Sequence, residues 1–474
     1  FRRNTYLGRD DTNGRDETTA RLAIAFENAV RGRLSIIYSR VDNGYDAFAL
    51  DNSYTMLSDK PGKDAQESIG SSLRLDWDEL GPGQLTSITA LASSDIGFSF
   101  DADWGNDDSW APVLYDYVSV SDRQRDTLSQ ELRYTTDDGL FGLYALKLDE
   151  GLATLNRGEY YDPGYDWADS LDYPFSSNFA STNVAGFAQL TLEPGDGTRV
   201  TAGLRVEHRS ADYNDRDGFM ASPSETRWGG ELSVSHDVSE ELTAYTSVAR
   251  GYKAGGFNLG LVPDEWRYFG DEAMWTLEAG IKSILDNAGI MLNAAVFHAW
   301  REDQQARASF QLVPNDPASF GFATINIEGG TNWCGELELQ WQLSPAVDIY
   351  ASAGLLFGGF PGTVEQFPWL EGREQAHAPR YTLATGVSWH SEKGWFARLD
   401  LSGRDEFYFD VSHNQHSQRY ALAHAQFGYE RENWRLQVWG RNLADEYYAV
   451  RGFFFGNEPP DCPATLYTRA GDPR

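Results

Sequence analysis

Residues 247–258, SVARGYKAGGFN, combine three glycines, a lysine and two aromatic side chains in a pattern that could cradle a phosphate. A phosphate-binding loop needs a helix directly after it, because the N-terminal amides of that helix hold the anion. The residues that follow, LGLVPDEWRYFGDEAMW, contain a proline and show no helical stripe of apolar residues. The glycines are therefore better explained by a tight bend and a close backbone approach at the end of a strand.

Two acidic segments rich in aromatic residues could capture a ligand. Residues 101–122 hold six aspartates and no lysine or arginine, and residues 159–172 hold one glutamate, four aspartates, three tyrosines and a tryptophan. Aromatic rings can stack on a ligand while carboxylates accept hydrogen bonds or hold a cation. A solvated acidic loop, or one bridged to lipopolysaccharide by divalent ions, is the simpler explanation for any single residue. The candidate ligand-binding residues are Trp104, Trp110, Tyr161 and Trp167.

Metal, redox and catalytic motifs are missing from the sequence. The histidines of HNQH (413–416) are better explained as solvent-exposed loop residues than as metal ligands. Cys334 and Cys462 lie far apart, and a disulfide between them is compatible with the sequence without following from it. No EF-hand spacing, nucleophile elbow or catalytic triad occurs. The sequence therefore predicts neither an enzyme nor a bound metal or cofactor.

The composition narrows the class of protein. The 474 residues carry 39 lysines and arginines against 71 aspartates and glutamates, and the net charge of −32 argues against nucleic-acid binding. No stretch approaches the roughly 20 apolar residues of a membrane helix. We expect the sequence to be truncated at both ends, so the lack of a targeting segment is not informative.

Apolar and polar residues alternate over most of the chain, which predicts strands with one apolar and one polar face. GELELQWQL (335–343) is an example. In a membrane barrel the apolar face of such a strand meets lipid. We therefore expect Leu337, Leu339 and Trp341 to point outward, and Glu336, Glu338 and Gln340 to point into the lumen.

The predicted connections alternate between short turns and long loops. This order is typical of the antiparallel up-and-down barrels of the outer membrane, which have tight turns at one end and large loops at the other. We expect the long loops to share one end of the barrel. They are predicted at residues 42–65, 99–124, 151–180, 211–223, 253–271, 304–331, 358–378 and 407–418.

A soluble β-propeller or sandwich would also contain many strands, with its apolar face inside. Predicted strands of roughly 11 to 13 residues favour the membrane barrel, because a tilted membrane strand needs about 9–11. Several tryptophans near short turns fit an interfacial girdle: Trp77, Trp341, Trp389, Trp395 and Trp434. We predict about 18 strands between Thr18 and Tyr447. Strands beyond both ends would bring the barrel to about 22, as in plugged transporters, although about 18 alone would fit a porin.

Several stretches resemble one protein family. ARGYKAGGFN (249–258) closely resembles a signature of TonB-dependent outer-membrane receptors, and NLADEYY (442–448) is similar to the stretch before their last loop and strand. HAPRYTLATGVSW (377–389) and GGTNWCGELELQW (329–341) resemble late barrel strands of that family. The segments NTYLGRDDTNGRDETTAR and DNGYDAFALDN are similar to a siderophore-receptor-like subgroup. The signature residues are Arg250, Gly251, Tyr252, Lys253, Gly255, Gly256, Phe257 and Asn258.

The resemblance implies uptake of a scarce ligand, often a ferric siderophore, powered through TonB across the outer membrane of a Gram-negative bacterium. The family's N-terminal plug, its TonB box and its final strand have no counterpart in the sequence. We therefore expect residues 1–474 to be a barrel domain with an empty lumen. Its sheet edges near 18–27 and 434–443 should be unpaired, unless fewer strands close the barrel.

The expected partners follow from the same resemblance. They are outer-membrane lipid and lipopolysaccharide, the TonB complex through the plug and box, and a small-molecule ligand such as a siderophore, bound by a monomer. The alternatives are a passive porin and, from a different class, a soluble β-propeller lectin or hydrolase. An acidic mouth should disfavour highly anionic ligands by charge repulsion.

Overall fold

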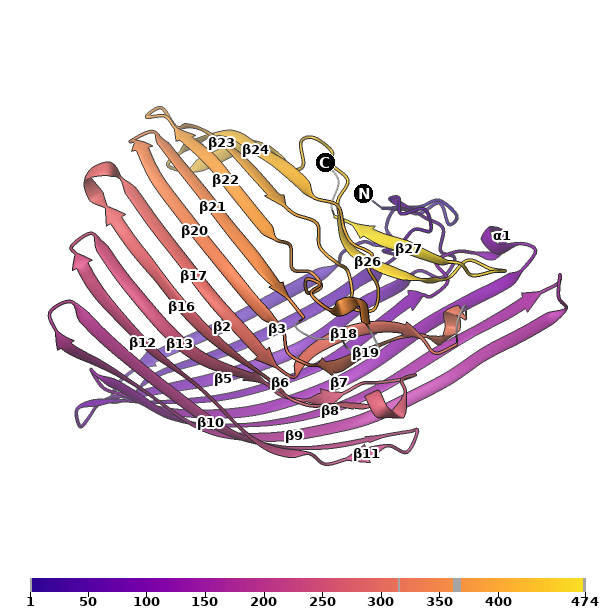
Figure 1. The fold of residues 1–474 in the computed structure, drawn as a ribbon, viewed down its shortest axis with the longest axis horizontal. Helices are drawn as coiled ribbons and strands as arrows, with labels where there is room; N and C mark the ends of the chain where they lie inside the picture. Colours follow the sequence, from indigo (N-terminus) through magenta and orange to yellow (C-terminus); the bar gives the residue numbers. More distant parts are fainter. Residues whose placement is uncertain (1, 314–315, 361–367, 472–474) are drawn as a thin grey trace.

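A computed structural model of the chain describes residues 2–313, 316–360 and 368–471. One antiparallel sheet of nineteen strands curls into a barrel (Figure 1). One of the nineteen, β11 (Met220–Ala221), has two residues and pairs only with β10. The remaining eighteen agree with the predicted number. They are β2 (Glu17–Glu27), β3 (Arg31–Tyr45), β5 (Gly62–Leu80), β6 (Gly83–Asp101), β7 (Leu114–Thr135), β8 (Gly139–Asp162), β9 (Trp167–Gly195), β10 (Thr198–Asp215), β12 (Ser224–Ser239), β13 (Leu242–Lys253), β16 (Glu272–Leu285), β17 (Ile290–Glu302), β20 (Thr331–Ser344), β21 (Val347–Gly359), β22 (Tyr381–His390), β23 (Trp395–Arg404), β24 (Tyr420–Arg431) and β25 (Trp434–Gly440).

The other elements belong to the connections. Two hairpins are large, namely β18 (Gln304–Gln311) with β19 (Phe320–Ile327), and β26 (Ala449–Gly456) with β27 (Ala464–Ala470). Among the described residues, no helix is both long and apolar enough to cross a membrane. The short elements are β1 (Arg3–Asn4), β4 (Thr55–Met56), β14 (Gly256–Phe257), β15 (Tyr268–Phe269), the single helical turn α1 (Asp107–Trp110) and the 3₁₀ turns Asp264–Trp266, Asp286–Ala288, Pro317–Ser319 and Pro368–Leu370.

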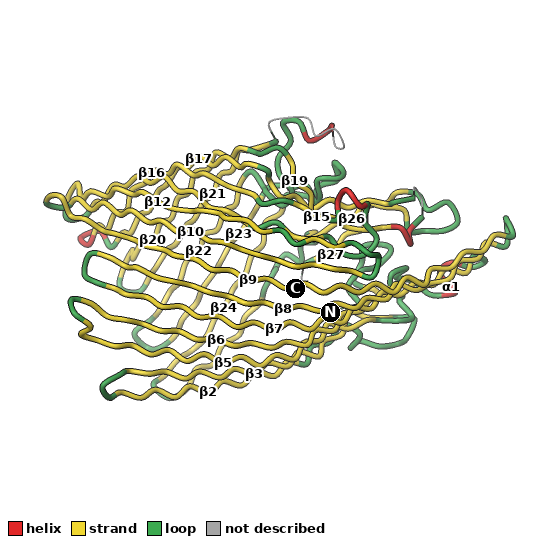
Figure 2. The backbone as a smooth tube through the Cα atoms, turned by 90° about the horizontal axis from the view of Figure 1, so that it is seen from below, coloured by secondary structure: helices red, strands yellow, loops and turns green. Residues whose placement is uncertain are grey.

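Short turns and long connections alternate along the sheet as predicted. The nine short turns join β2 to β3, β5 to β6 and so on to β24 and β25, and they gather at one end of the barrel (Figures 1 and 2). Positive φ angles of 68° at Gly197 and 91° at Gly394 make two of these turns tight, and glycine adopts such angles without strain. The long connections lie at the opposite end, which is called the mouth below.

Three of the predicted long loops are wrong, because strands fill much of them. β7, β8 and β9 have 22, 24 and 29 residues, so 99–124 and 151–180 are largely strand, and β10 and β11 occupy part of 211–223. The three long strands pair with one another throughout, down to Asp162 opposite Trp167. Above the membrane both faces of a sheet meet water, so the alternation that marks a membrane strand disappears there. The β8–β9 hairpin projects beyond the other strands (Figure 1).

The polar face of the sheet lines the interior. On β16 the Glu272 carboxylate accepts a hydrogen bond from the backbone N–H of Gln305, in a hairpin inside the mouth, at 2.9 Å. Residues 272 and 278 share one face, and the register places Glu278 opposite Phe297, which lies opposite Cys334. Glu336, Glu338 and Gln340 share that interior face, and Leu337, Leu339 and Trp341 point outward, as predicted.

The outer face carries a row of aromatic side chains near the mouth. The rings of Trp275 and Trp300 lie parallel with centroids 6.2 Å apart, and Trp228 meets Trp275 edge to face at 5.7 Å. The ring of His298 stacks on Trp333 at 4.1 Å. Such a row fits a lipid–water boundary, where an indole keeps its N–H in the headgroup layer. The sequence had suggested a girdle only at the short-turn end.

Two strand edges remain unpaired. The ladders run from β2 to β25, and among the described residues none joins these two strands to each other. All eleven residues of β2 are exposed on both faces, and β25 is exposed over six of its seven residues. This agrees with the predicted edges near 18–27 and 434–443. Beyond the sheet, the Nδ2 group of Asn52 donates to the carbonyl of Leu466, so the connections on the two sides of this seam are fastened at the mouth.

Candidate functional site

The glycine-rich segment after β13 bends into the mouth and lies against the barrel wall. The ring of Phe257 stacks on Tyr213 of β10 with centroids 4.2 Å apart, and Arg209 donates to the carbonyl of Gly255 at 2.9 Å. A Cβ atom at Gly255 would lie 2.5 Å from the carbonyl oxygen of Phe269, and the segment has no room for it. The predicted close backbone approach is confirmed, and it explains why a glycine stands here.

Asn258 joins this segment to the β18–β19 hairpin. Its side chain is buried; Oδ1 accepts from the backbone N–H of Thr324 at 2.7 Å, and Nδ2 donates to the carbonyl of Thr324 at 2.8 Å. The amide therefore pairs with β19 as a backbone peptide group would. Gln305 adds two bonds of 2.9 Å from Nε2 to the carbonyls of Ala254 and Gly270. Three side-chain hydrogen bonds thus fix the hairpin to the signature segment, and a fourth fixes it to Gly270 in the same connection.

The first four signature residues, 250–253, belong to barrel strand β13, and two of them contact neighbouring strands. Arg250 lies over the ring of Trp228 at 4.5 Å and donates to that residue's carbonyl. The hydroxyl of Tyr252 accepts a bond from Nε of Arg205 on β10 at 3.3 Å. Gly251 has open space around it and Lys253 is exposed. The signature as a whole therefore anchors a connection to the wall.

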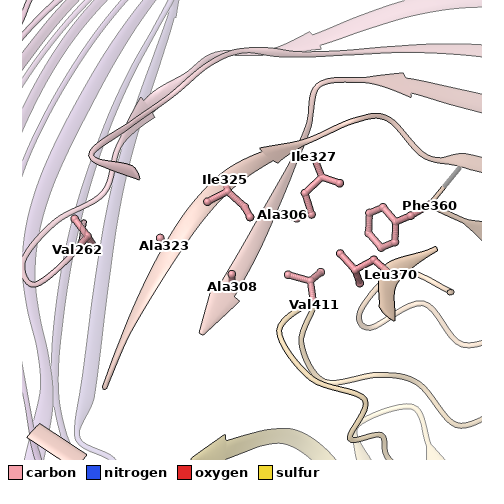
Figure 3. Close-up of a cluster of buried hydrophobic side chains, with 9 residues drawn as sticks. All are labelled: Val262, Ala306, Ala308, Ala323, Ile325, Ile327, Phe360, Leu370 and Val411. Atoms are coloured by element: carbon pink, nitrogen blue, oxygen red, sulfur yellow. The ribbon is translucent and has the colours of Figure 1, made fainter. Parts of the chain in front are cut away.

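The β18–β19 hairpin has a small hydrophobic core of its own (Figure 3). One face of the hairpin packs against residues from three other connections. The opposite face carries polar residues together with Phe320 and Phe322. The hairpin is therefore a rigid platform, because the apolar packing and the Asn258 bonds hold it from two sides. The core residues are Val262, Ala306, Ala308, Ala323, Ile325, Ile327, Phe360, Leu370 and Val411.

The β26–β27 hairpin lies across the mouth and contacts the connection between β6 and β7. The hydroxyl of Tyr115 donates to Oδ1 of Asn457, in the turn of the hairpin, at 2.6 Å, and Nδ2 of Asn457 donates to the carbonyl of Asp103 at 3.1 Å. On its other side, Phe455 stacks on Phe320 of β19 at 4.3 Å, and Phe453 lies 5.7 Å from Phe322. The two hairpins therefore meet inside the mouth.

A cavity of about 580 Å³ opens between these hairpins, within the size range of small-molecule sites. We call it the arginine cavity, because the described residues of its lining include three arginines and one carboxylate. The lining residues are Arg301, Gln304, Gln305, Ala306, Arg307, Phe322, Phe360, Gln375, Ala376, His377, Phe409, Asp410, Val411, Val450, Arg451, Gly452 and Phe453.

The charges in the arginine cavity are unevenly paired. Arg301 forms a 3.2 Å ion pair with Glu272. Asp410 is used within its own loop, where Oδ1 accepts from the N–H and the hydroxyl of Ser412 at 2.8 and 2.6 Å. Within the described part of the chain, neither Arg307 nor Arg451 has a carboxylate within ion-pair distance. These two exposed guanidinium groups are available to a ligand.

The protonation of the cavity follows from this excess of positive charge. Burial lowers the pKa of Arg307, and the charge of Arg451 lowers it further. Burial also lowers the pKa of His377, again helped by Arg451. His377 is therefore neutral at pH 7 and can donate or accept a hydrogen bond, while the arginines keep their charge.

The four candidate residues from the sequence fall into two pairs. Trp110 is only 7 % exposed and its indole N–H donates to Asp103 at 3.1 Å, while Trp104 packs against Phe48, Phe455 and Tyr467. Both lie inside packed aromatic clusters. Tyr161 and Trp167 sit at the tip of the β8–β9 hairpin and are 39 % and 53 % exposed. Their role in ligand binding stays a prediction.

The carboxyl groups beside Trp104 and Trp110 are buried. Asp101 and Asp103 are 5 % and 2 % exposed; Asp101 accepts from the backbone N–H of Trp104, and Asp103 accepts from those of Gly105 and Tyr117. Burial raises the pKa of Asp101 to about 8, and the adjacent Asp103 contributes to the increase. These aspartates therefore hold the β6–β7 connection in shape.

The two histidines of HNQH (413–416) differ in their exposure. His416 is exposed as expected, but His413 is buried, because its loop folds back over Arg373, which donates to the carbonyl of His413 at 2.6 Å. The residues that the structure describes contain no group of three or more side chains able to hold a metal ion. Cys334 and Cys462 are both free thiols.

Sequence reasoning missed the arginine cavity. Arg301 lies on barrel strand β17, Arg307 and Arg451 lie in two different connections, and no local spacing relates the three. The only usable signal was the presence of basic residues in loops of a strongly acidic chain. The expectation of an acidic mouth does not hold at this cavity, where basic side chains predominate.

Comparisons with known proteins place the chain in a family. A family model described as "TonB dependent receptor-like, beta-barrel" matches residues 2–443. Pesticin receptors from Yersinia enterocolitica and Yersinia pestis are each 23 % identical over 350 residues, which cover 69 % of this chain and 48 % of the relative. The chain thus spans about half the length of these curated relatives.

Solved structures share the fold. The ferric yersiniabactin uptake receptor FyuA from Yersinia pestis superimposes with a TM-score of 0.79 at 18 % identity, covering 99 % of this chain and 71 % of that one. The siderophore receptor PiuA from Acinetobacter baumannii gives a TM-score of 0.71 at 16 % identity, covering 98 % and 74 %. The chain belongs to the TonB-dependent receptor β-barrel family of the Gram-negative outer membrane.

Proposed function

We propose that this chain forms the barrel of a receptor that takes up a scarce ligand, of the ferric-siderophore kind, by TonB-dependent active transport. The observation that carries the proposal is the arginine cavity, which two rigid hairpins build inside the mouth of a barrel of this family. The printed names of the relatives, pesticin receptor, ferric yersiniabactin uptake receptor and siderophore receptor, support the ligand class.

The full-length protein, in this proposal, adds a plug with a TonB box and the strands that close the seam between β2 and β25. The unpaired edges of these two strands support this, because an unpaired backbone group is costly in lipid. The coverage of 48 % of the curated relatives is consistent with a longer chain. Contact with TonB would lie in the plug portion. The barrel would act as a monomer, with its outer face against lipid and lipopolysaccharide.

The test is transport by the full-length gene in a Gram-negative host with and without TonB. Iron(III) is supplied as carboxylate, phenolate and hydroxamate chelates, and accumulation of radioactive iron is measured. We expect at least one chelate to accumulate only in cells that have TonB. If each chelate that enters the cells accumulates to the same level with and without TonB, the protein is a passive porin and active transport is contradicted.

A further inference from the structure

We infer that the arginine cavity binds a ligand with at least two anionic oxygen groups, carboxylate or phenolate, through Arg307 and Arg451. This rests on the proposed function and narrows its ligand to polyanions. It also reverses the expectation from the net charge of −32 that the mouth repels anions. The charges that line the cavity, and not the net charge of the chain, determine which ligands it attracts, because a cavity wall of low dielectric focuses the field of the nearest groups.

The geometry of the two arginines is fixed by aromatic rings. The guanidinium carbon of Arg307 lies 4.3 Å from the ring centroid of Phe322, and that of Arg451 lies 5.0 Å from the centroid of Phe453. The two rings are themselves 5.7 Å apart. A guanidinium group held over a ring keeps its N–H edge free, and that edge fits the two oxygens of a carboxylate. Two such forks in one cavity suit a ligand with two anionic groups.

Among the residues that the structure describes, no carboxylate forms an ion pair with Arg307 or Arg451. Asp410, the one carboxylate of the lining, is held by Ser412 and accepts a third, longer bond of 3.4 Å from the N–H of Ser309. His377 is neutral at pH 7. A bound anion between Arg307 and Arg451 would relieve the repulsion between them, whereas a cation would add to it.

The hairpins bring the arginines together, so the site depends on both. Arg307 lies on β18, which the Asn258 bonds and the small hydrophobic core hold against the wall. Arg451 lies on β26, which the Asn457 bonds hold across the mouth. Neither hairpin alone carries two unpaired arginines at the cavity. Because both hairpins are held in place, the site is preformed, and a preformed site loses less entropy when a ligand binds.

Two probes of the same shape and different charge test the inference. Benzene-1,3,5-tricarboxylate carries three negative charges at pH 7, and benzene-1,3,5-tricarboxamide carries none. Binding of each to the full-length protein in detergent is measured by calorimetry for the wild type and for Arg307→Gln, Arg451→Gln and the double variant. Arg157→Gln is the matched control, because Arg157 is an exposed mouth arginine that pairs with Asp172 outside the cavity.

We expect the wild type to prefer the tricarboxylate, and each cavity variant to weaken its binding by about tenfold, because a hydrogen bond to a charged group is lost. The control variant should bind as the wild type does. Added salt should weaken wild-type binding more than that of the double variant, and Arg307→Lys should restore part of the affinity. An absence of preference, unchanged tricarboxylate binding in the double variant, or equal losses for both probes would overturn the inference.

The two proposals fail in different ways. TonB-dependent uptake without any preference for the charged probe would refute the polyanion site and leave the transport function intact. Arginine-dependent binding of the tricarboxylate by a protein whose uptake ignores TonB would refute the transport function alone.

Discussion

The ring of Phe257 lies parallel to that of Tyr213, with 4.2 Å between their centroids and 8° between their planes. One residue belongs to the glycine-rich signature and the other to the barrel wall. Phe257 also lies within 6.1 Å of Phe179 and 5.4 Å of Tyr268. The signature therefore acts as a structural anchor: it turns the connection inward and fixes the base of the β18–β19 hairpin.

Replacing Phe257 with alanine should loosen this anchor. Half-buried aromatic contacts of this kind contribute about 1–2 kcal/mol, so amide exchange in residues 254–271 should accelerate by about tenfold. Hydrogen exchange read by mass spectrometry measures this. Phe357→Ala, on the outer face and 58 % exposed, is the control and should leave that segment unchanged. Equal protection in wild type and Phe257→Ala would show that the stack does not hold the loop.

Replacing Asn258 with alanine should release β19 without unfolding the barrel. The change leaves the backbone N–H and C=O of Thr324 without their partner, and an unsatisfied buried group costs about 1–3 kcal/mol. We expect faster exchange in residues 304–311 and 320–327. Asn106→Ala is matched in residue type and burial, but its side chain caps α1 instead. If both variants affect the hairpin equally, Asn258 has no specific positioning role.

The β6–β7 connection should open as the pH rises. Asp101 has a raised pKa, so the folded state keeps a proton that the unfolded state has already lost. Its contribution to stability is complete below the usual aspartate pKa of about 4 and disappears as the pH rises through about 8. The exchange of residues 102–113, corrected for its intrinsic pH dependence, should therefore accelerate as the pH rises from about 5 to about 8, by up to about tenfold per pH unit, and should level off above pH 8.

Asp101→Asn supplies the control for this titration, because the amide stays neutral at every pH. The corrected exchange of the variant should not change over the same interval. Asp59, Lys60 and Asp103 also lie around the group. A pH dependence that persists in Asp101→Asn would assign the titration to one of these neighbours.

The two pairs of aromatic candidates should behave differently on substitution. Trp167→Ala and Tyr161→Ala remove exposed rings, and we expect weaker ligand binding, by about 1–2 kcal/mol for a stacking contact, with stability unchanged. Trp110→Ala opens a packed cluster and should lower the thermal midpoint, since such truncations cost about 3–5 kcal/mol. Binding titrations and melting curves separate the two effects. Full affinity in both tip variants would remove the β8–β9 tip from ligand capture.

Local patterns predicted the membrane part of this protein well, because a strand with lipid on one face and water on the other must alternate apolar and polar residues. Leu337 and Glu336 alternate since one neighbour meets lipid and the other water, and a tight turn such as that at Gly197 needs a residue that tolerates positive φ. The same rule does not apply above the membrane. β9 continues past the bilayer with water on both faces. Its outer half therefore lacks the alternation of apolar and polar residues, and the sequence predicted a loop there.

The arginine cavity was not predictable for a different reason. Arg307 and Arg451 approach each other only because two hairpins, each held by side-chain amides, meet in the mouth. Asn258 could be marked as part of a signature, but its bonds to Thr324 depend on the path of a connection far along the chain. Net charge was misleading, because the acidic residues lie elsewhere and the cavity collects the basic ones.

The proposed transport through this barrel requires that Glu336 and Glu338 face a water-filled lumen while Leu337 and Leu339 face lipid. Single cysteines at these four positions, in a background with Cys334 and Cys462 changed to serine, test this directly in outer-membrane vesicles. A membrane-impermeant maleimide should label Glu336→Cys and Glu338→Cys rapidly and leave Leu337→Cys and Leu339→Cys unlabelled until the lipid is dissolved. Equal labelling at all four positions, or the opposite alternation, would contradict the account.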